Sequence, residues 1–293
     1  MNSYDTAIVG GSPRNAPAAH MHGYLSRDGM PPSAFLAQGR DEVTRYGGKI
    51  LDASVTDVVP DGTTGFSILF ADGHRVRARR LLVTTGLTDE LPDVPGLADR
   101  WARDVLHCPY CHGHEVRDRQ LGVIGGSPGA VRYARIVRQW THDLVYFTPP
   151  GMLTSTDRAG LVARAIGVVE GTIEELVVDA DERLCGVRMA EGAVVPRDAL
   201  FVPPRFIPRS SLIADLGCAV DDDGWTTTDN TGRTSVPGVW AAGNVVDPRA
   251  QVITAAGAES AAAIAINADL VDDDVRNAIT NYHHGHTAEP AHP

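Results

Sequence analysis

Residues 120–148, QLGVIGGSPGAVRYARIVRQWTHDLVYFT, decide the predicted fold. The apolar run at 120–124 predicts a strand, GGSPGA forms a turn, and residues 131–140 have the spacing of a helix that packs on a sheet. A second strand is predicted at 144–148. A strand, a glycine-rich turn, a helix and a strand within about 30 residues are typical of a dinucleotide-binding βαβ unit. Gly125 and Ser127 in the turn are therefore candidate cofactor-binding residues.

The chain opens with a less complete unit of the same kind, YDTAIVGGSPRNAPAAHMHG at residues 4–23. A strand at 6–9 runs into Gly10 and Gly11, which are candidate cofactor-binding residues. Such a turn normally leads into a helix whose free N–H groups face a pyrophosphate. Here Pro13 and Pro17 follow almost at once. The sequence therefore predicts that the phosphate-binding helix is missing.

The rest of the chain alternates predicted strands and helices, which indicates an α/β protein. An amphipathic helix is expected at 32–46, with Phe35, Leu36, Val43 and Tyr46 on or near one face. An alanine-rich helix is expected from residue 251. Further strands are expected at 49–59, 65–70, 74–78, 80–85, 168–170, 175–178 and 186–189. A chain of 293 residues that is 43% hydrophobic suits two domains.

The charge balance and the termini limit the possible partners. A formal net charge of −11 with no run of Lys or Arg disfavours binding to nucleic acid or to anionic membranes. No stretch approaches the roughly 18 apolar residues of a membrane span. The first residues lack the pattern of a signal peptide. We expect a cytoplasmic protein, no resident metal, and a disordered histidine-rich tail at 281–293.

The chemistry is predicted to centre on HCPYCHGHE at 107–115, in which two residues separate Cys108 from Cys111. Two thiols at this spacing can close a disulfide and exchange electrons in pairs. His112 is the best candidate for an acid or base, and we expect His107 and His114 at the surface. A zinc site, a haem attachment of the CxxCH kind and a buried structural pair remain as alternatives, although only two further cysteines are present, which stand alone.

These motifs together resemble the thioredoxin reductase family of flavin-dependent disulfide oxidoreductases. The sequence CPYCHG stands just before the βαβ unit, TTG at 84–86 precedes it, and SVPGVWAAGNV at 235–245 follows. The resemblance runs from residue 4 to about 270. It is greatest to the CPYCHG branch, which includes dithiol oxidases of sulfur-containing natural products. The implied fold is a two-domain, three-layer α/β fold of the pyridine nucleotide-disulfide oxidoreductase type, here with a truncated first βαβ unit.

The resemblance also implies a domain plan and a flavin site. An FAD-type domain would comprise residues 1–113 and 224–280, with an inserted NAD(P)-type domain at 114–223 that carries the cysteine pair at its start. Cys111 would lie against the isoalloxazine and Cys108 would meet the substrate. The resemblance further implies that the protein forms a homodimer. The residues that match its flavin contacts are Thr84, Thr85, Gly86, Gly243, Asn244, Gln251, Val252 and Ile253.

Three departures from the family pattern shape the expected function. Roughly 20 residues, a helix and a strand, are missing after Gly11, which weakens the hold on the ADP half of FAD. Ser127 and Pro128 narrow the second turn, and Pro149 and Pro150 replace the arginines that hold NADPH. We therefore predict a flavin-dependent enzyme that oxidises a small dithiol, with NADPH use disfavoured. A flavin-free derivative with a repurposed pocket and a noncatalytic partner are the alternatives.

Overall fold

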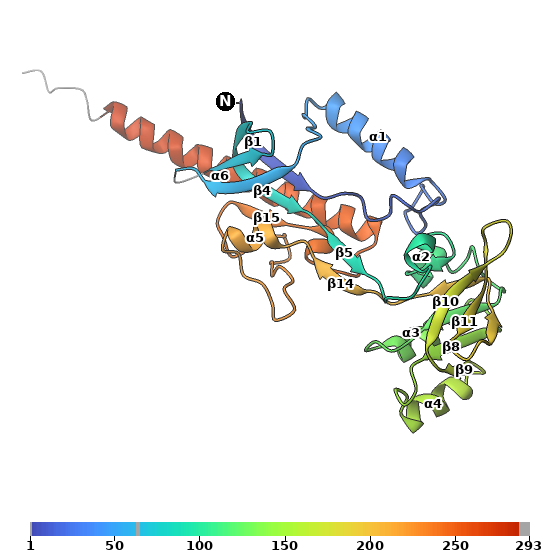
Figure 1. Cartoon of the computed structure of the whole chain (residues 1–293). Helices are drawn as coiled ribbons and strands as arrows, with labels where there is room; N and C mark the ends of the chain where they lie inside the picture. The colour runs from blue at the N-terminus through green and yellow to red at the C-terminus, as the bar shows by residue number, and fades with distance from the viewer. Residues whose placement is uncertain (1, 63–64, 287–293) are drawn as a thin grey trace, which may run out of the picture. The chain divides into compact units, whose positions relative to one another are not determined.

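A computed structural model describes residues 2–62 and 65–286, which form two compact units (Figure 1). Unit 1 comprises Met1–Pro13, Gly47–Thr88 and Pro208–Pro293. Unit 2 comprises Arg14–Tyr46 and Asp89–Ile207. Each unit has its own hydrophobic core. The chain passes from one unit to the other after residues 13, 46, 88 and 207, the last two within the paired strands β5 (Leu87–Glu90) and β14 (Arg205–Pro208).

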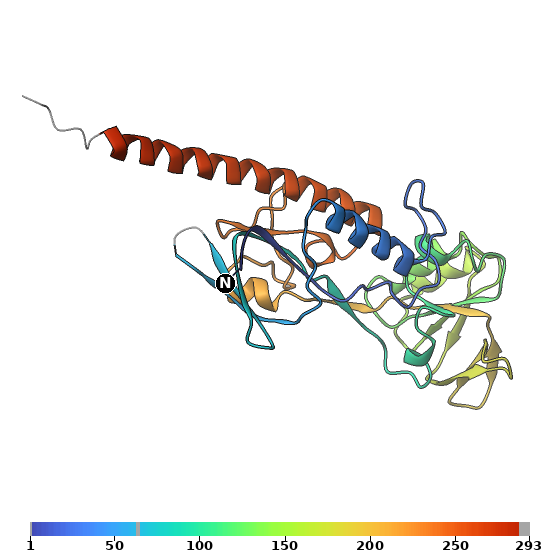
Figure 2. The same ribbon diagram turned by 90° about the horizontal axis from the view of Figure 1, so that it is seen from above.

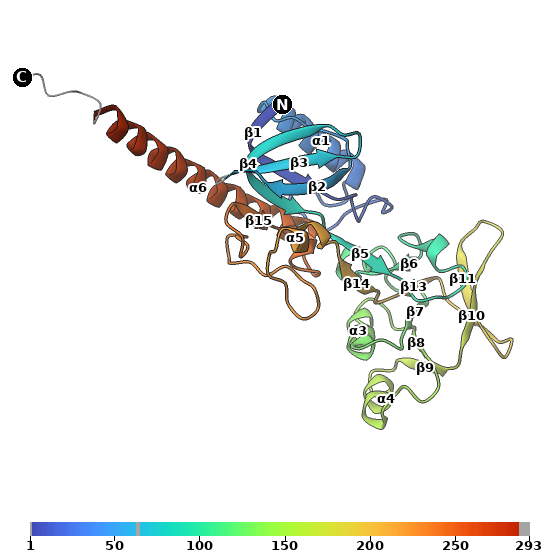
Figure 3. The same ribbon diagram turned by 60° about the vertical axis from the view of Figure 1, so that its left-hand side comes forward.

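Unit 1 is built on a sheet whose central strand is β4 (Arg75–Thr84) (Figure 3). The strand pairs in parallel with β1 and β15 and antiparallel with β3, which in turn pairs with β2. The core below the sheet contains Ile68, Leu81 and Val239 with Ile213 of the short helix α5 (Ser211–Asp215). The remaining strands are β1 (Asn2–Gly10), β2 (Val55–Pro60), β3 (Phe66–Phe70) and β15 (Val239–Ala241).

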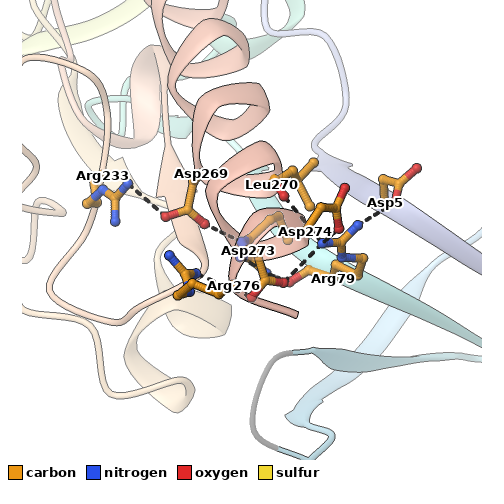
Figure 4. A network of polar contacts seen from close by, with 9 residues as sticks. Asp5, Arg79, Arg233, Asp269, Leu270, Asp273, Asp274 and Arg276 are labelled. Carbon is orange, nitrogen blue, oxygen red and sulfur yellow. Dashed lines mark hydrogen bonds and ion pairs between the residues drawn. The ribbon is translucent and has the colours of Figure 1, made fainter. Parts of the chain in front are cut away.

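The sequence predicts two strands, at 74–78 and 80–85, where the structure has the single strand β4. The arginines at its centre interrupt the apolar pattern, but they bind carboxylates of the C-terminal helix α6 (Val252–His286). Figure 4 shows this network, in which Arg79 contacts Asp273 at 3.0 Å and Asp274 at 2.5 Å. Arg80 is 5% exposed and lies 2.5 Å from Asp269. The arginines therefore continue the strand and attach it to α6.

The helix α6 is longer than the sequence predicts. Its first half packs Ala262 and Ile266 against Leu82 and Trp240 of the sheet, and its second half runs on past the strands of unit 1 (Figure 2). Residues 281–286, expected in a disordered tail, are helical. The rest of that predicted tail, 287–293, lies outside the described residues. No helix in the described part of the chain is both long and apolar enough to span a bilayer.

The first strand, β1, lies at an edge of the sheet. It pairs with β4 over its whole length, and among the described residues it has no other strand partner. Ile8 is 66% exposed. Residues 11–31 contain no helix, as the sequence predicts. No helix from this segment therefore covers the side of β1 on which Ile8 is exposed. That about 20 residues are missing relative to the family stays a prediction.

Unit 2 contains a parallel sheet in the order β6-β13-β7-β8-β9. The predicted βαβ unit is confirmed as β7 (Leu121–Ile124), α3 (Ala130–Val137) and β8 (Leu144–Thr148). Ala130, Ala134 and Val137 bury the inner face of α3. The other elements are β6 (Val105–Leu106), β13 (Ala199–Phe201), β9 (Gly167–Glu170), α4 (Ser155–Val162) and an antiparallel sheet of β10 (Ile173–Val178), β11 (Leu184–Met189) and β12 (Val194–Pro196).

The predicted amphipathic helix is confirmed as α1 (Pro32–Arg45), but its apolar face is not buried. Leu36 is 41% exposed, Val43 is 45% exposed and Tyr46 is 90% exposed. Only the ring of Phe35 has an aromatic neighbour, Tyr24, at a centroid distance of 5.0 Å. The predicted apolar face of α1 is therefore largely exposed in the single chain.

Candidate functional site

Cys108 and Cys111 form a disulfide in unit 2, with their Cα atoms 5.1 Å apart. Cys108 is the N-cap of the one-turn helix α2 (Pro109–His112), and its sulfur accepts a hydrogen bond from the Cys111 N–H at 3.1 Å. Pro109 occupies the first helical position, where its fixed φ suits the helix and no N–H is needed. Both cysteines are half-buried, so the pair is accessible to a small reactant.

Gly113 ends this turn against a large side chain. Its φ of −59° is helical, so its backbone conformation does not require glycine. A Cβ at this position would instead overlap the indole of Trp140 and the carbonyl oxygen of Pro109. The absence of a side chain at Gly113 therefore lets the one-turn helix α2 pack directly on Trp140.

His107 is partly buried, which corrects the expectation that it lies at the surface. Its Nδ1 is buried and has no hydrogen-bond partner among the described residues. The imidazole is parallel to the ring of Tyr133 at 6.4 Å and meets the edge of Phe206 at 5.1 Å. Burial, aided by the charge of Arg14, lowers the pKa of His107 to about 4. His107 is therefore neutral near pH 7. His114 is exposed, as predicted.

His112, the predicted acid or base, is 16% exposed, and its Nδ1 lies 3.4 Å from Oε2 of Glu115. The other oxygen of Glu115 lies 2.9 Å from Nε2 of His22. His22 also contacts Asp28 at 3.2 Å. Sequence reasoning missed His22 and Glu115 as partners of His112. The only local signal was the three-residue spacing from His112 to Glu115.

The predicted cofactor residues of unit 1 converge at the carboxyl ends of three parallel strands. Gly10 at the end of β1 pairs with Thr84 at the end of β4. A Cβ on Gly11 would overlap the carbonyl oxygen of Thr85, so these backbones touch. The chain leaving β15 joins them, because Ala242 N–H donates to the carbonyl of Val83 at 3.1 Å. Ligands of α/β proteins commonly bind at such strand ends.

The glycines of this cluster turn the chain away from the strand ends. Gly86 has a φ of +73° and Gly243 a φ of +77°, a region that side chains rarely adopt. A Cβ on Gly243 would lie 3.9 Å from Ala255 in the first turns of α6, so the beginning of that helix is close by.

Asn244 forms hydrogen bonds to the loop that leads to α6. Its Nδ2 donates to the carbonyls of Asp247 at 2.9 Å and Ala250 at 3.0 Å. Gln251 immediately precedes the helix, Val252 is its first residue, and the following Ile253 is 41% exposed. These three residues therefore lie at the end of α6 that is near Gly243.

Gly125 and Ser127 lie in unit 2, in the turn between β7 and α3. A Cβ on Gly125 would overlap the ring of Tyr146, and its N–H donates to the carbonyl of Phe147 at 2.7 Å. Close packing against the neighbouring strand is therefore enough to require Gly125. The carbonyl of Ser127 accepts from Ala130 N–H at 3.2 Å, which begins the helix.

The other two cysteines have separate surroundings. Cys185 is exposed on β11, and its sulfur contacts the carbonyl of Val177 at 3.4 Å. Cys218 is buried and contacts Thr234 at 3.4 Å. Within residues 2–62 and 65–286, no three His, Cys, Asp or Glu side chains are arranged to hold a metal ion.

Comparison with known proteins gives consistent matches over most of the chain. The profile of the family described as pyridine nucleotide-disulphide oxidoreductase matches residues 6–260. Thioredoxin reductase sirT of Leptosphaeria maculans is 27% identical, over 93% of this chain and 87% of that protein. Thioredoxin reductase tcpT of Claviceps purpurea is 30% identical, over 82% of this chain and 78% of its own length. The crystal structure of HlmI is 52% identical with a TM-score of 0.92, covering 96% of this chain and 89% of HlmI.

Proposed function

This chain belongs to the pyridine nucleotide-disulphide oxidoreductase family, and we propose that within it the protein oxidises a small dithiol through Cys108 and Cys111, with FAD as the electron acceptor. Its matched relatives carry the name thioredoxin reductase, so it is a thioredoxin reductase-like disulfide oxidoreductase. We assign flavin binding to unit 1, whereas unit 2 contains the cysteine pair.

The disulfide between Cys108 and Cys111 is the observation that carries the proposal. One thiolate of the substrate attacks Cys108, which forms a mixed disulfide and releases Cys111 as a thiolate. The second substrate thiol, after losing its proton, attacks the substrate sulfur of that mixed disulfide and releases Cys108. The substrate leaves as a disulfide, and two electrons remain on the enzyme as a dithiol. His112 takes up a proton during these attacks.

The residues of unit 1 fit the flavin end of FAD. Gly86 has open space beside its Cα, which leaves room for a flat ligand, whereas a Cβ on Gly243 would touch Oε1 of Glu259 at 3.7 Å. Since Nδ2 of Asn244 is engaged by two carbonyls, its Oδ1 is the atom offered to a ribityl hydroxyl. When bound, FAD would supply a two-electron acceptor for the enzyme dithiol, with oxygen as the final acceptor.

The fit to the phosphate end is poorer, because no helix follows Gly11. Arg209 is a cationic side chain that lies beside Gly11. Its NH1 would lie 3.2 Å from a Cβ on Gly11, and its Nε donates to Thr88 at 3.0 Å. We assign Arg209 to the pyrophosphate in place of the missing helix. NADPH is not part of the proposal, because Tyr146 packs against the turn at Gly125 and Pro149 packs beside Gly126.

The missing helix also favours a second candidate, a flavin-free derivative whose pocket is repurposed for another reaction. Uptake of FAD distinguishes the two candidates. We further propose that the protein is a homodimer, because the edge of β1 and the apolar face of α1 are uncovered in the single chain.

Substitution of each cysteine tests the proposed chemistry. Cys108→Ser and Cys111→Ser should each lower dithiol oxidation at least about a thousandfold, because each removes one sulfur of the pair. Oxygen consumption with a small dithiol such as dithiothreitol measures the rate. The matched control is Cys185→Ser, which should retain the wild-type rate because that thiol is exposed on β11. Full activity of either variant of the pair would exclude the redox role.

A further inference from the structure

Glu115 lies between two imidazoles in unit 2, with one carboxylate oxygen for each. Oε1 is 2.9 Å from Nε2 of His22, and Oε2 is 3.4 Å from Nδ1 of His112. The second ring nitrogen of His22 faces another carboxylate, because Nδ1 lies 3.2 Å from Oδ2 of Asp28. Asp28 is itself fixed by Gly23 N–H at 2.9 Å. Four side chains thus form a continuous series from Asp28 to the residue next to Cys111.

The two carboxylates define the charge state of His22. A carboxylate is only an acceptor, so both ring nitrogens must carry a proton to satisfy both contacts. Burial alone would lower the pKa of His22, but hydrogen bonds to Glu115 and Asp28 outweigh burial and raise it. With its side chain 23% exposed, His22 lies between two carboxylates, an arrangement that favours a proton on each ring nitrogen.

We infer that Asp28, His22 and Glu115 are positioning residues, which hold His112 with its proton on Nδ1 and leave Nε2 to accept the proton of a reacting thiol. The inference rests on the proposed function. An acceptor on one ring nitrogen fixes the tautomer of a histidine. In this arrangement the S–H bond of the thiol breaks, a bond forms from the proton to Nε2, and Glu115 stabilises the imidazolium. The proton later leaves from Nε2 to water.

Other charged groups near this series do not join it. His20 lies 3.8 Å from Oε1 of Glu115, beyond hydrogen-bonding distance, and is 54% exposed. Nε2 of His114 lies 3.0 Å from NH1 of Arg117, and His114 is a minor contributor to the lowered pKa of Asp28. His107 faces His112 as a neutral group at pH 7. The matched control for His22 is therefore His20, which approaches the same oxygen without a hydrogen bond.

The first test is a double-mutant cycle on dithiol oxidation. Glu115→Gln should lower kcat/KM about tenfold, because the base is no longer oriented. His22→Gln should lower it severalfold alone but cause no further loss in the Glu115→Gln background, because it acts through Glu115. His20→Gln should stay within about twofold of the wild type. Additive losses from Glu115→Gln and His22→Gln, or full activity of Glu115→Gln, would overturn the inference.

The second test needs no turnover. In protein labelled with nitrogen-15 histidine, two-bond proton–nitrogen spectra show which ring nitrogen of neutral His112 carries the proton. The inference predicts Nδ1 in the wild type. In Glu115→Gln it predicts Nε2, because the one amide oxygen accepts from His22 and the NH2 group is left to donate to Nδ1 of His112. His20→Gln keeps Nδ1. An unchanged tautomer in Glu115→Gln overturns it, even if activity falls. If the cysteine variants stay fully active, the proposed function fails, while the spectra still decide the tautomer. Should Glu115→Gln not fold, Glu115→Ala and His22→Gln are compared in the same way.

Discussion

At the scale of single residues, the turn at residues 108–113 depends on a cysteine cap at its start and on a glycine without a side chain at its end. Cys108 caps a helix of one turn with its own sulfur, and Gly113 closes that turn without a side chain. Because Trp140 fills the space beside Gly113, this contact helps to position the turn that carries both cysteines.

Gly113→Ala should destabilise unit 2 by about 1 to 3 kcal/mol, because the added methyl group overlaps Trp140 and Pro109. The matched control is Gly39→Ala in α1, where an added Cβ meets nothing within 4 Å. That change should stabilise the protein by roughly 0.5 to 1 kcal/mol, because alanine is the better helix former. Urea denaturation measures both. Equal stability of Gly113→Ala and the wild type would contradict the packing contact.

The sequence was sufficient to predict that Cys108 and Cys111 can pair, but not which side chains surround the histidines near them. The spacing of Cys108 and Cys111 was enough to predict that they can pair. His107 was expected at the surface, because its burial comes from Tyr133 and Phe206, distant in the chain. The contact between His22 and Glu115 joins residues 93 positions apart, and no local pattern indicates it.

At the scale of elements, α6 is attached to β4 by arginines and carboxylates (Figure 4). The expected helix began at residue 251 and was followed only through its alanine-rich part to 271. The expected helix stopped before the acidic run at 272–274, although Val275 and Ile279 continue from Val271 at helical spacing. Asp273 nevertheless faces Arg79 and Arg80 and is 6% exposed. Charge pairing between distant elements thus extends α6 and also joins two predicted strands into β4.

Asp273→Asn should lower the free energy of unfolding by about 1.5 to 3 kcal/mol at pH 7, because it weakens the charged hydrogen bond to Arg79 and the ion pair with the buried Arg80. Asp274→Asn is the matched control, since Asp274 contacts the same Arg79 but its side chain is 63% exposed. It should cost less than about 1 kcal/mol. Chemical denaturation compares the two, and an equal cost would contradict the role assigned to Asp273.

The same pair predicts a pH dependence. The hydrogen bond from Arg79 lowers the pKa of Asp273 from its ordinary value of 3.8. The stabilisation is therefore complete above 3.8 and is lost as the pH falls through the lower value of the folded state. The difference between the wild type and Asp273→Asn should shrink only below this pH. A difference that already disappears between pH 7 and pH 5 would contradict this assignment.

At the scale of the whole molecule, the family and the α/β fold class were predicted correctly from the sequence. Motif order was sufficient for both, because the βαβ unit, the cysteine pair and the glycine motif after β15 keep their order in the chain. The limits of the two units could not be predicted in the same way. Unit 2 takes in residues 14–46, far from its main segment in the sequence. The predicted domain limits, the bound flavin and the homodimer stay predictions.

The central claim is that electrons pass from a dithiol through Cys108 and Cys111 to FAD. The most direct measurement is the visible spectrum of the protein mixed with FAD and freed of unbound flavin, recorded without oxygen before and after addition of dithiothreitol. We expect a yellow protein whose flavin absorption band bleaches quickly in the wild type and at least about a hundredfold more slowly in Cys108→Ser. A colourless protein that retains no FAD, or equally fast bleaching in both proteins, would contradict it.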